Sequence, residues 1–320
     1  MIDEELKIFE VNLAVSNICN ADCLFCPRSF VKVAPADRFM SVESVRKIMQ
    51  EVSTSEFRED HPVVHSVLSE NGEPFMNPHI LDILREVRKV GLYITLFSNF
   101  ALITKDIAKI LIDENLVDNL DVNIDGLIDE TYRAVKGISL DRVEENLRRF
   151  IELRNSSCSS IRVRIHCISH YTYTKAVNMA FGIGPVKGKG YTYLQDGPSV
   201  VEKWKRVVNP ALDGVGEDSV MFWAERYNDK KREGVFACPN LGRVQHVAYI
   251  NPKGDWYACC FDTGNDLVVG NVLETSILEV SKSERRKDLI AKLGARKFGE
   301  IGFPCTRVDA CSGVERGGIV

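Results

Sequence analysis

Three cysteines near the start of the chain could bind a metal through their thiolates. Cys19, Cys23 and Cys26 have the spacing Cys-x3-Cys-x2-Cys and follow a strand-like run at residues 7–16. A structural zinc ion or an ordinary iron–sulfur cluster takes four protein ligands. Because the nearby sequence has no fourth Cys or His, the loop predicts an iron–sulfur cluster with one open iron, filled by a ligand from outside the protein. A zinc knuckle and unrelated core thiols are the alternatives.

A second group of cysteines lies towards the other end of the sequence. Five of the ten cysteines occur from residue 238 onward: Cys238, Cys259, Cys260, Cys305 and Cys311. Gly254 lies between two β-rich runs, 247–250 and 256–258, and predicts a hairpin that returns Cys259 towards Cys238. A set of four thiolates suits zinc as well as an iron–sulfur cluster, so the spacing by itself leaves both open.

Between the two groups, short β-rich runs alternate with longer amphipathic runs. The predicted strands cover residues 63–68, 93–98, 117–124 and 161–168, and the predicted helices cover residues 42–52, 78–90, 105–114 and 140–154. This alternation predicts an α/β fold with a parallel sheet and crossover helices. With a weaker sixth unit at 190–196, about six βα units precede residue 200, too few for an eight-stranded barrel.

Polar residues lie where the predicted strands end. Glu73 follows the second strand, Ser98 and Asn99 end the third, and Asn123 and Asp125 end the fourth. In parallel α/β folds, functional residues gather at the carboxyl ends of the strands. These side chains are therefore candidates for one site.

The predicted fifth strand has a polar face. Arg162, Arg164 and His166 alternate with apolar residues, so the three share one side of the strand. Three polar residues in a barrel interior would indicate that this face lines a site, whereas an exposed strand edge is the alternative. The glycine-rich run at 182–190 lacks the Gly-Lys-Ser/Thr ending of a phosphate loop and is predicted to be a flexible loop near the barrel mouth.

Composition and charge exclude several classes of function. The 320 residues are 45% apolar, enough for one large core or a main domain with a smaller one, and the net charge of −4 argues against a nucleic-acid partner. Residues 1–5 do not resemble a signal peptide, and no apolar run is long enough to span a membrane. We expect a cytoplasmic protein without a membrane partner. In that compartment, ten cysteines indicate metal binding rather than disulfides.

The cysteine loop resembles the signature of the radical S-adenosylmethionine (SAM) superfamily. The run Glu70-Asn71-Gly72-Glu73-Pro74 looks like that family's Gly-Gly-Glu-Pro motif, with Asn71 replacing the first Gly. The resemblance implies a partial (β/α)6 barrel and a 4Fe–4S cluster on the three cysteines of the loop, whose open iron binds SAM. It also implies reductive cleavage of SAM to a 5'-deoxyadenosyl radical that abstracts a hydrogen atom from the substrate. An electron donor such as flavodoxin or ferredoxin would supply the electron.

The same resemblance implies residues that contact SAM. Phe25 occupies the position that lies against adenine, and Glu73 accepts a hydrogen bond from the SAM ammonium. Family members place ribose and SAM carboxylate ligands at strand ends that correspond here to Ser98, Asn99, Asn123 and Asp125. Arg164 is our candidate for a contact with the SAM carboxylate.

The region from Cys238 onward resembles Twitch, a shortened SPASM-type module that holds one auxiliary 4Fe–4S cluster. The resemblance implies four ligands: Cys238, Cys259, Cys305 and Cys311. We assign residues 1–200 to the barrel, 201–237 to a connecting segment, within a predicted connection at 198–216, and 238–320 to the auxiliary domain.

Cys260 has no place in that ligand set. Because it follows Cys259, the strand pleat should direct it to the opposite face, where its thiol could give a hydrogen atom to a carbon radical. The adjacent Cys-Cys pair resembles radical SAM epimerases of ribosomal peptides, and a Cys donor also occurs in the aminoglycoside type. A buried thiol that only packs in the core is the alternative.

We therefore predict an epimerase acting on an aminosugar, an aminocyclitol or a ribosomal peptide. The lack of a peptide-recognition extension before the first strand favours a small polar substrate over a short peptide. Two alternatives remain open, a Twitch-type dehydrogenase of an alcohol and a non-catalytic iron–sulfur or zinc protein.

Overall fold

The computed structural model describes residues 6–23, 26, 28, 32–168, 197–218, 238, 240–302 and 304–306. Its centre is a nine-stranded sheet with the order β6-β5-β4-β3-β2-β1-β7-β8-β9. The first six strands run parallel: β1 (Glu10–Leu13), β2 (His65–Leu68), β3 (Tyr93–Phe97), β4 (Asn119–Asn123), β5 (Arg162–Ile168) and β6 (Gly214–Asp218). This arrangement confirms the predicted parallel sheet of a partial barrel.

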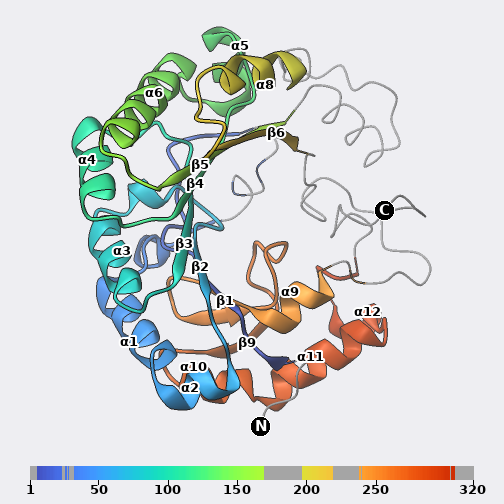
Figure 1. Cartoon of the computed structure of the whole chain (residues 1–320). Coiled ribbons are helices and arrows are strands. Elements are labelled where there is room, and N and C mark those ends of the chain that lie inside the picture. The colour runs from blue at the N-terminus through green and yellow to red at the C-terminus, as the bar shows by residue number, and fades with distance from the viewer. Residues whose placement is uncertain are drawn as a thin grey trace, which may run out of the picture.

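Helices cover the outer face of the curved sheet (Figure 1). They are α1 (Val42–Val52), α2 (Ser55–Asp60), α3 (Ile80–Arg88), α4 (Lys105–Asp113), α5 (Asp129–Lys136), α6 (Leu140–Ser156) and α8 (Gly197–Lys205). Side chains of Ser41, Thr104 and Ser139 accept backbone N–H groups at the first turns of α1, α4 and α6, which satisfies donors that a helix start leaves free. The helices predicted at 42–52, 78–90, 105–114 and 140–154 are confirmed within two residues at each end.

Alternation along the strands separates an apolar outer face from a polar inner face. Leu13, Leu68 and Leu96 are in register on neighbouring strands and are fully buried under the helices. On the opposite face, Asn12 and Thr95 occupy the adjacent register row. Because side chains of successive strand residues point to opposite faces, one face builds the core and the other lines the interior of the partial barrel.

The C-terminal region extends the same sheet. Strand β7 (Val247–Ile250) pairs in parallel with β1, and β8 (Asp255–Tyr257) and β9 (Val268–Asn271) follow antiparallel. Gly254 turns the predicted β7–β8 hairpin with φ +86°, and a Cβ there would lie 2.5 Å from Leu273 Cγ. Only glycine adopts such a conformation without cost. The hairpin prediction is therefore confirmed.

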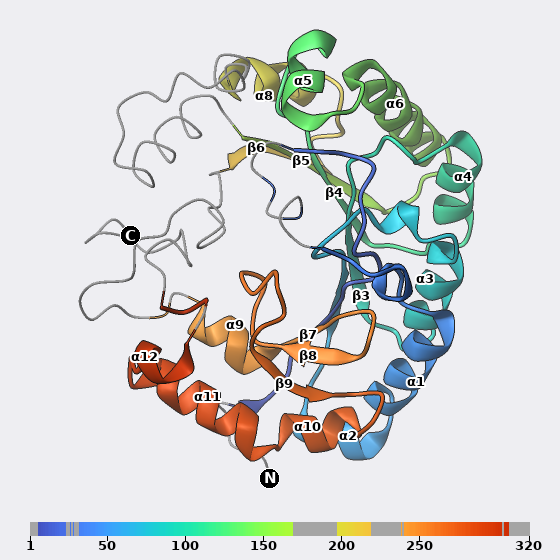
Figure 2. The ribbon, with the colours of Figure 1, turned by 180° about the vertical axis from the view of Figure 1, so that it is seen from behind.

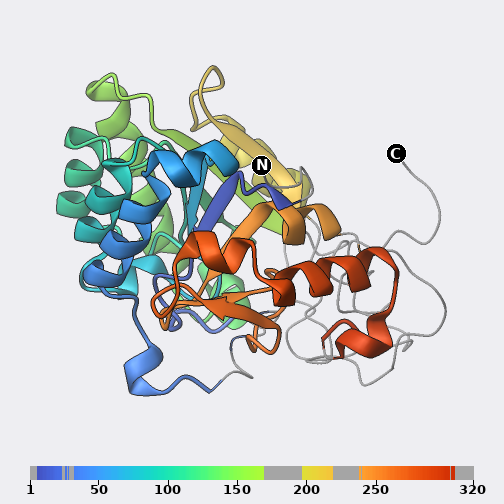
Figure 3. The same ribbon diagram turned by 90° about the horizontal axis from the view of Figure 1, so that it is seen from below.

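Four helices accompany these strands, as Figures 2 and 3 show: α9 (Leu241–His246), α10 (Ile277–Ser281), α11 (Glu284–Gly294) and α12 (Phe298–Ile301). Helix α10 packs on α1 and β9. Its first backbone N–H, at Ile277, donates to Glu51 Oε2 at 2.7 Å, and Ser281 Oγ lies 2.8 Å from His61 Nε2. These contacts fasten the C-terminal region to the barrel.

The segment 198–216 is not the irregular connection that its sequence predicted. It contains most of α8 and the start of β6, which pairs with β5. The sequence Gly-Val-Gly-Glu-Asp carries little β-propensity, so the strand depends on tertiary contacts. Asp213, just before β6, accepts two hydrogen bonds from the fully buried Arg154 of α6, at 2.8 and 2.7 Å. The unit predicted at 190–196 lies outside the described residues. None of the described helices is long and apolar enough to cross a membrane.

Candidate functional site

The cysteine loop lies against the loop that follows β2. Glu73 N donates to Ile18 O at 2.9 Å. A Cβ on Gly72 would lie 2.4 Å from Ile18 O and 2.5 Å from Ser16 O. Such an approach between two backbones requires glycine. Gly72 therefore holds the predicted SAM motif directly against the chain that leads into Cys19.

The end of α5 supports the same loop from another side. Asp22 N donates to Lys136 O at 2.9 Å. Gly137 ends the helix in the left-handed region at φ +73°, and a Cβ added at this residue would lie 3.1 Å from Asp22 N. Arg28 Nη2 donates to Ala21 O at 2.9 Å. The backbone between Cys19 and Cys23 is thus fixed by contacts from two parts of the chain.

The three thiols of this loop influence one another. Burial raises the pKa of Cys19, and burial raises the pKa of Cys23 to about 12, with further increases from the charges of neighbouring thiols in this loop. A thiol ligand must lose its proton, and a bound metal supplies the positive charge that favours this. Within the described part of the chain, no three Cys, His, Asp or Glu side chains are placed so that they could hold a metal ion. By their chemistry, three thiolates without a fourth protein ligand suit a cluster with one open iron, and the assignment of Cys19, Cys23 and Cys26 to it stays a prediction.

Glu73 joins the motif after β2 to the end of β3. Its Oε1 accepts hydrogen bonds from Ser98 Oγ at 2.9 Å and Phe75 N at 3.2 Å, and its Oε2 accepts one from Asn99 N at 2.8 Å. Burial raises the pKa of this carboxyl to about 7. No Lys, Arg or His of the described chain forms an ion pair with Glu73. A cationic ligand such as an ammonium group would supply the missing charge.

Asn99 extends this cluster to the cysteine loop. Its Nδ2 donates to Asn20 Oδ1 at 2.8 Å and lies 3.7 Å from Cys19 Sγ. The structure therefore brings together Glu73, Ser98 and Asn99 beside the first cysteine, as expected for residues at the carboxyl ends of parallel strands.

The residues after β4 have protein partners. Asp125 is buried and lies 2.6 Å from Lys136 Nζ. Asn123 O accepts a hydrogen bond from Tyr132 OH at 3.3 Å. The Asp125 carboxylate thus points to the end of α5, beside the cysteine loop.

Arg164 is part of a charged group on the inner face of β4 and β5. Its Nε and Nη2 donate to both carboxylate oxygens of Asp121, at 2.7 and 2.6 Å, and His166 Nε2 lies 3.3 Å from Asp121 Oδ1. Burial raises the pKa of Asp121, but hydrogen bonds from His166 and Arg164 outweigh it and leave the pKa below its usual value. Val163 and Ile165 are buried on the other face, so the predicted alternation of β5 is confirmed.

The two adjacent cysteines after β8 have different surroundings. Burial raises the pKa of Cys259, and the charges of Cys260 and Cys305 raise it further. Burial and the charge of Glu70 raise the pKa of Cys260 to about 12, while a hydrogen bond with Tyr249 lowers it. Burial and the charge of Glu70 both favour the protonated thiol. Cys238 and Cys305 are half-buried.

Glu70 connects Cys260 with the SAM motif. It has a φ of +91°, unusual for a residue with a side chain, and its Oε1 accepts a hydrogen bond from Asn12 Nδ2 at 3.0 Å. Two residues separate it from Glu73, so one short loop directs one carboxyl towards Ser98 and another towards the environment of Cys260. Glu70 belongs to the quoted motif, but its sequence position alone indicates no role for it.

Tyr249 and Arg243 complete the surroundings of Cys260. Arg243 Nε donates to Tyr249 OH at 2.6 Å, and its Nη2 donates to Glu10 Oε1 at 3.0 Å. Sequence reasoning missed both residues, as it missed Lys136 and Asp121. Only the alternation of polar and apolar residues along a strand could have indicated Tyr249 and Asp121.

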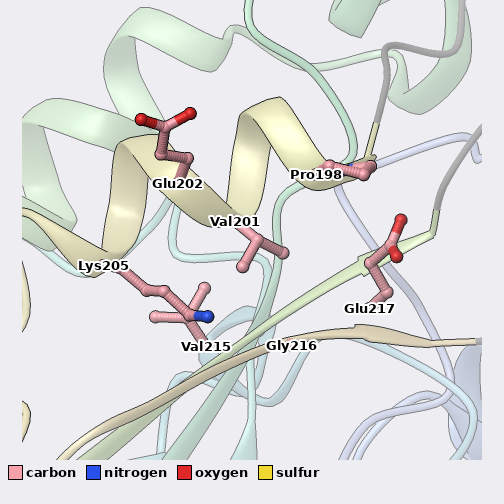
Figure 4. Close-up of a pocket in the computed structure, with 7 residues that line it drawn as sticks. All are labelled: Pro198, Val201, Glu202, Lys205, Val215, Gly216 and Glu217. Carbon is pink, nitrogen blue, oxygen red and sulfur yellow. The ribbon is translucent and has the colours of Figure 1, made fainter.

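Two of the predicted site residues, Phe25 and Cys311, lie outside the described residues. A separate cavity of about 440 Å³ lies between α8 and β6 (Figure 4). Its lining includes Glu202, Lys205 and Glu217. None of the predicted site residues lines this cavity.

Comparison with known protein families gives two matches that cover most of the chain. Residues 13–172 match the model of the radical SAM superfamily, and residues 238–311 match SPASM, an iron–sulfur cluster-binding domain. The first match includes the three-cysteine loop and Glu73. The second includes the cysteines of the C-terminal region.

Individual proteins are similar only at low identity. The chain is 23% identical over 140 residues to GTP 3',8-cyclase of Limosilactobacillus fermentum, a match that covers 43% of this chain and 40% of that protein, so it spans less than half of this curated relative.

Two solved structures share the fold over nearly the whole chain. BtrN in complex with AdoMet and 2-DOIA is 14% identical, with a TM-score of 0.54 and coverage of 96% of this chain and 93% of BtrN. Native anSMEcpe with bound AdoMet and the Cp18Cys peptide is also 14% identical, with a TM-score of 0.57 and coverage of 97% and 91%.

Proposed function

The chain belongs to the radical SAM superfamily, and we propose that it is an epimerase in which Cys260 returns a hydrogen atom to the substrate. It is a radical SAM enzyme with a SPASM domain, and it uses SAM and 4Fe–4S clusters, including an auxiliary cluster. When bound, SAM and its cluster supply the 5'-deoxyadenosyl radical that removes a hydrogen atom from the substrate.

We assign the ligands from the two groups of cysteines. Cys19, Cys23 and Cys26 hold the cluster that binds SAM, and Cys238, Cys259, Cys305 and Cys311 hold the auxiliary cluster. Besides burial, the charge of Cys26 raises the pKa of Cys19 and of Cys23, which supports the first group. Besides burial, the charges of Cys260 and then of Cys305 raise the pKa of Cys259, which supports a place for Cys305 near Cys259.

Around SAM, the buried carboxyl of Glu73, which forms no ion pair among the described residues, binds the ammonium group. Ser98 and Asn99 orient this carboxyl and place it beside Cys19. Phe25 contacts adenine, while Asn123, Asp125 and Arg164 act near the ribose and the carboxylate of SAM. Asp125 is paired with Lys136, and Arg164 is paired with Asp121. In this proposal, Asp125 and Arg164 each contribute to SAM binding as one member of an ion pair.

The observation that carries the epimerase proposal is the surroundings of the Cys260 thiol. Burial and the charge of Glu70, which lies on the loop that also carries Glu73, raise its pKa. Burial and the charges of Cys260 and of Cys305, a proposed ligand, raise the pKa of Cys259. We infer that the Cys260 thiol lies on the side of the SAM motif and is not required by the auxiliary cluster. In this proposal it donates its hydrogen to a substrate radical in the barrel interior.

In the proposed reaction, Cys260 transfers one hydrogen atom to the substrate radical. The S–H bond of Cys260 breaks and a C–H bond forms on the face of the substrate carbon opposite the first abstraction, which leaves a sulfur-centred radical on Cys260. One electron from a flavodoxin- or ferredoxin-type donor and one proton from solvent restore the thiol. The substrate keeps its mass, and in deuterated water it gains one deuterium at the inverted carbon.

The proposed substrate is a small polar amine such as an aminosugar or aminocyclitol, with a short ribosomal peptide second. Structures with the same fold hold either kind of molecule, 2-DOIA in the complex with BtrN and a peptide in anSMEcpe. The polar inner face, with Glu10, Asn12, Asp121 and Arg164, supports a polar substrate.

The test compares Cys260→Ala with Cys167→Ala in anaerobically reconstituted protein, using a panel of aminosugars, aminocyclitols and peptides. Cys167 is a buried thiol on the outer face of β5, so its variant controls for the loss of one buried sulfur. We expect Cys260→Ala to keep its iron and to form 5'-deoxyadenosine, but to yield no inverted product. Cys167→Ala should retain epimerisation.

Other outcomes would contradict the proposal. Normal inversion by Cys260→Ala would remove the donor role, and loss of auxiliary iron would make Cys260 a ligand. A wild-type product two hydrogens lighter would identify a dehydrogenase. A reduced, reconstituted protein that cleaves no SAM would have a binding role without catalysis.

A further inference from the structure

A buried cation lies at the end of α5, next to the cysteine loop. The Lys136 side chain is 6% exposed, and its Nζ is 2.6 Å from Asp125 Oδ2, whose side chain is 0% exposed. Removing two charges from water costs several kcal/mol per ion, and a mutual ion pair repays this only in part. A buried ion pair therefore adds little net stability to the fold, which points to a role in the adjoining site.

The backbone of Lys136 faces the loop directly. Lys136 O accepts the N–H of Asp22, the residue before Cys23, and Gly137 packs on Asp22. Burial has the largest effect on the pKa of the Cys23 thiol and raises it, while the charge of Lys136 lowers this pKa and the charge of Asp125 raises it. The buried cation of the pair belongs to the helix end that contacts the residue before Cys23.

We infer that Lys136 is a positioning residue that stabilises negative charge at the Cys23 side of the SAM-binding cluster and so raises its reduction potential. Asp125 holds this cation and partly offsets its charge. The inference rests on the proposed function, because it takes Cys23 as a cluster ligand. Reduction adds one electron to the cluster, and a nearby cation in a poorly polarisable interior lowers the free energy of the more negative state.

The test measures the midpoint potential of the SAM-responsive cluster in the full reconstituted chain. That cluster is recognised by the change in its electron paramagnetic resonance signal when SAM is added. The key comparison is Asp125→Asn with the double variant Asp125→Asn/Lys136→Met, since residue 125 is then constant and only the cation differs. The double variant also avoids leaving a buried carboxylate unpaired.

We expect the double variant to have at least a tenfold smaller ratio of reduced to oxidised cluster than Asp125→Asn at the same applied potential, a shift of about 59 mV for one electron. Asp125→Asn alone should move the potential upward from wild type. Lys136→Arg should keep the wild-type potential, because the charge is retained. Arg133→Met removes an exposed cation from the same helix and should leave the potential unchanged.

Equal potentials in Asp125→Asn and the double variant would overturn the inference. So would weaker SAM binding in the double variant without a shift in the SAM-free potential, which would assign Lys136 to SAM itself. If the double variant lost iron, Asp125→Asn alone would decide, because the inference still requires its midpoint potential to be higher than that of wild type.

Cys23→Ala separates this inference from the proposed function. Retention of the SAM-responsive cluster in that variant would refute the ligand assignment. If Cys23→Ala lost the cluster and the Lys136 variants kept an unchanged midpoint potential, the inference would be refuted and the proposed function would stand.

Discussion

Replacing Gly72 with Ala should disturb both the SAM motif and the cysteine loop. The added Cβ would lie 2.4 Å from Ile18 O, 2.5 Å from Ser16 O and 2.9 Å from Ile18 N. All three are backbone atoms, so no side chain can rotate away and one of the two loops has to move. Overpacking of this kind costs about 1–3 kcal/mol, and loss of the hydrogen bond from Glu73 N to Ile18 O adds about 1 kcal/mol.

The expected fall in stability is therefore about 2–4 kcal/mol. With an unfolding entropy of about 2 cal/mol/K per residue, this corresponds to a Tm lower by about 3–6 °C for a chain of this length. Because the displaced loops carry Glu73 and lead into Cys19, iron content and SAM affinity should fall as well.

Gly242→Ala in α9 is the matched control. A Cβ at that position would meet no atom within 4 Å, and alanine in a helix is favoured over glycine by roughly 0.5–1 kcal/mol. Thermal unfolding, iron per chain and SAM titration of the three proteins check the prediction. If Gly72→Ala matched wild type and Gly242→Ala in all three measurements, the close approach of the two loops would be refuted.

Two further predictions concern the same region. Replacing Cys19, Cys23 and Cys26 together with Ala should reduce reconstituted iron from about eight to about four atoms per chain and abolish formation of 5'-deoxyadenosine; full iron and activity would place the ligands elsewhere. Glu73 has a pKa of about 7, so SAM binding at pH 7 should release roughly half a proton and strengthen as the pH rises. Glu73→Gln should abolish this release and weaken binding by about 1.5–3 kcal/mol, which calorimetry in buffers of different ionisation enthalpy can measure; equal proton release by both proteins would contradict it.

Through the same Glu73 carboxyl, a rise in pH that strengthens SAM binding lowers the stability of the SAM-free fold. Without SAM, burial raises the pKa of Glu73 from 4.5 in the unfolded reference to about 7 in the folded state. The folded protein then binds more protons than the unfolded chain between these values. The contribution of Glu73 to stability is complete below pH 4.5 and declines as the pH rises towards 7.

Periodicity and spacing in the sequence were sufficient for much of the fold. The helices at 42–52 and 105–114 and the β7–β8 hairpin were predictable because each depends on local chemistry, namely an apolar stripe, a capping residue or a glycine turn. The cysteine spacing and the motif around Glu73 indicated the radical SAM family, and the family match agrees. Strand β6 escaped prediction because Asp213 and Arg154 stabilise its position from outside the strand.

By itself, the sequence determined which residue types stand at the strand ends and which cysteines are close along the chain. The tertiary structure decided their partners: Asp125 with Lys136, Arg164 with Asp121, and Cys260 with Tyr249 and the charge of Glu70. It also decided that β7 pairs with β1. The spacing of apolar and polar residues along a segment indicates which of its faces is buried, and it depends only on residues that are neighbours in the sequence. The choice of a charged partner depends on strand order and register, which bring together residues far apart in the sequence and hold them where water cannot screen their charges.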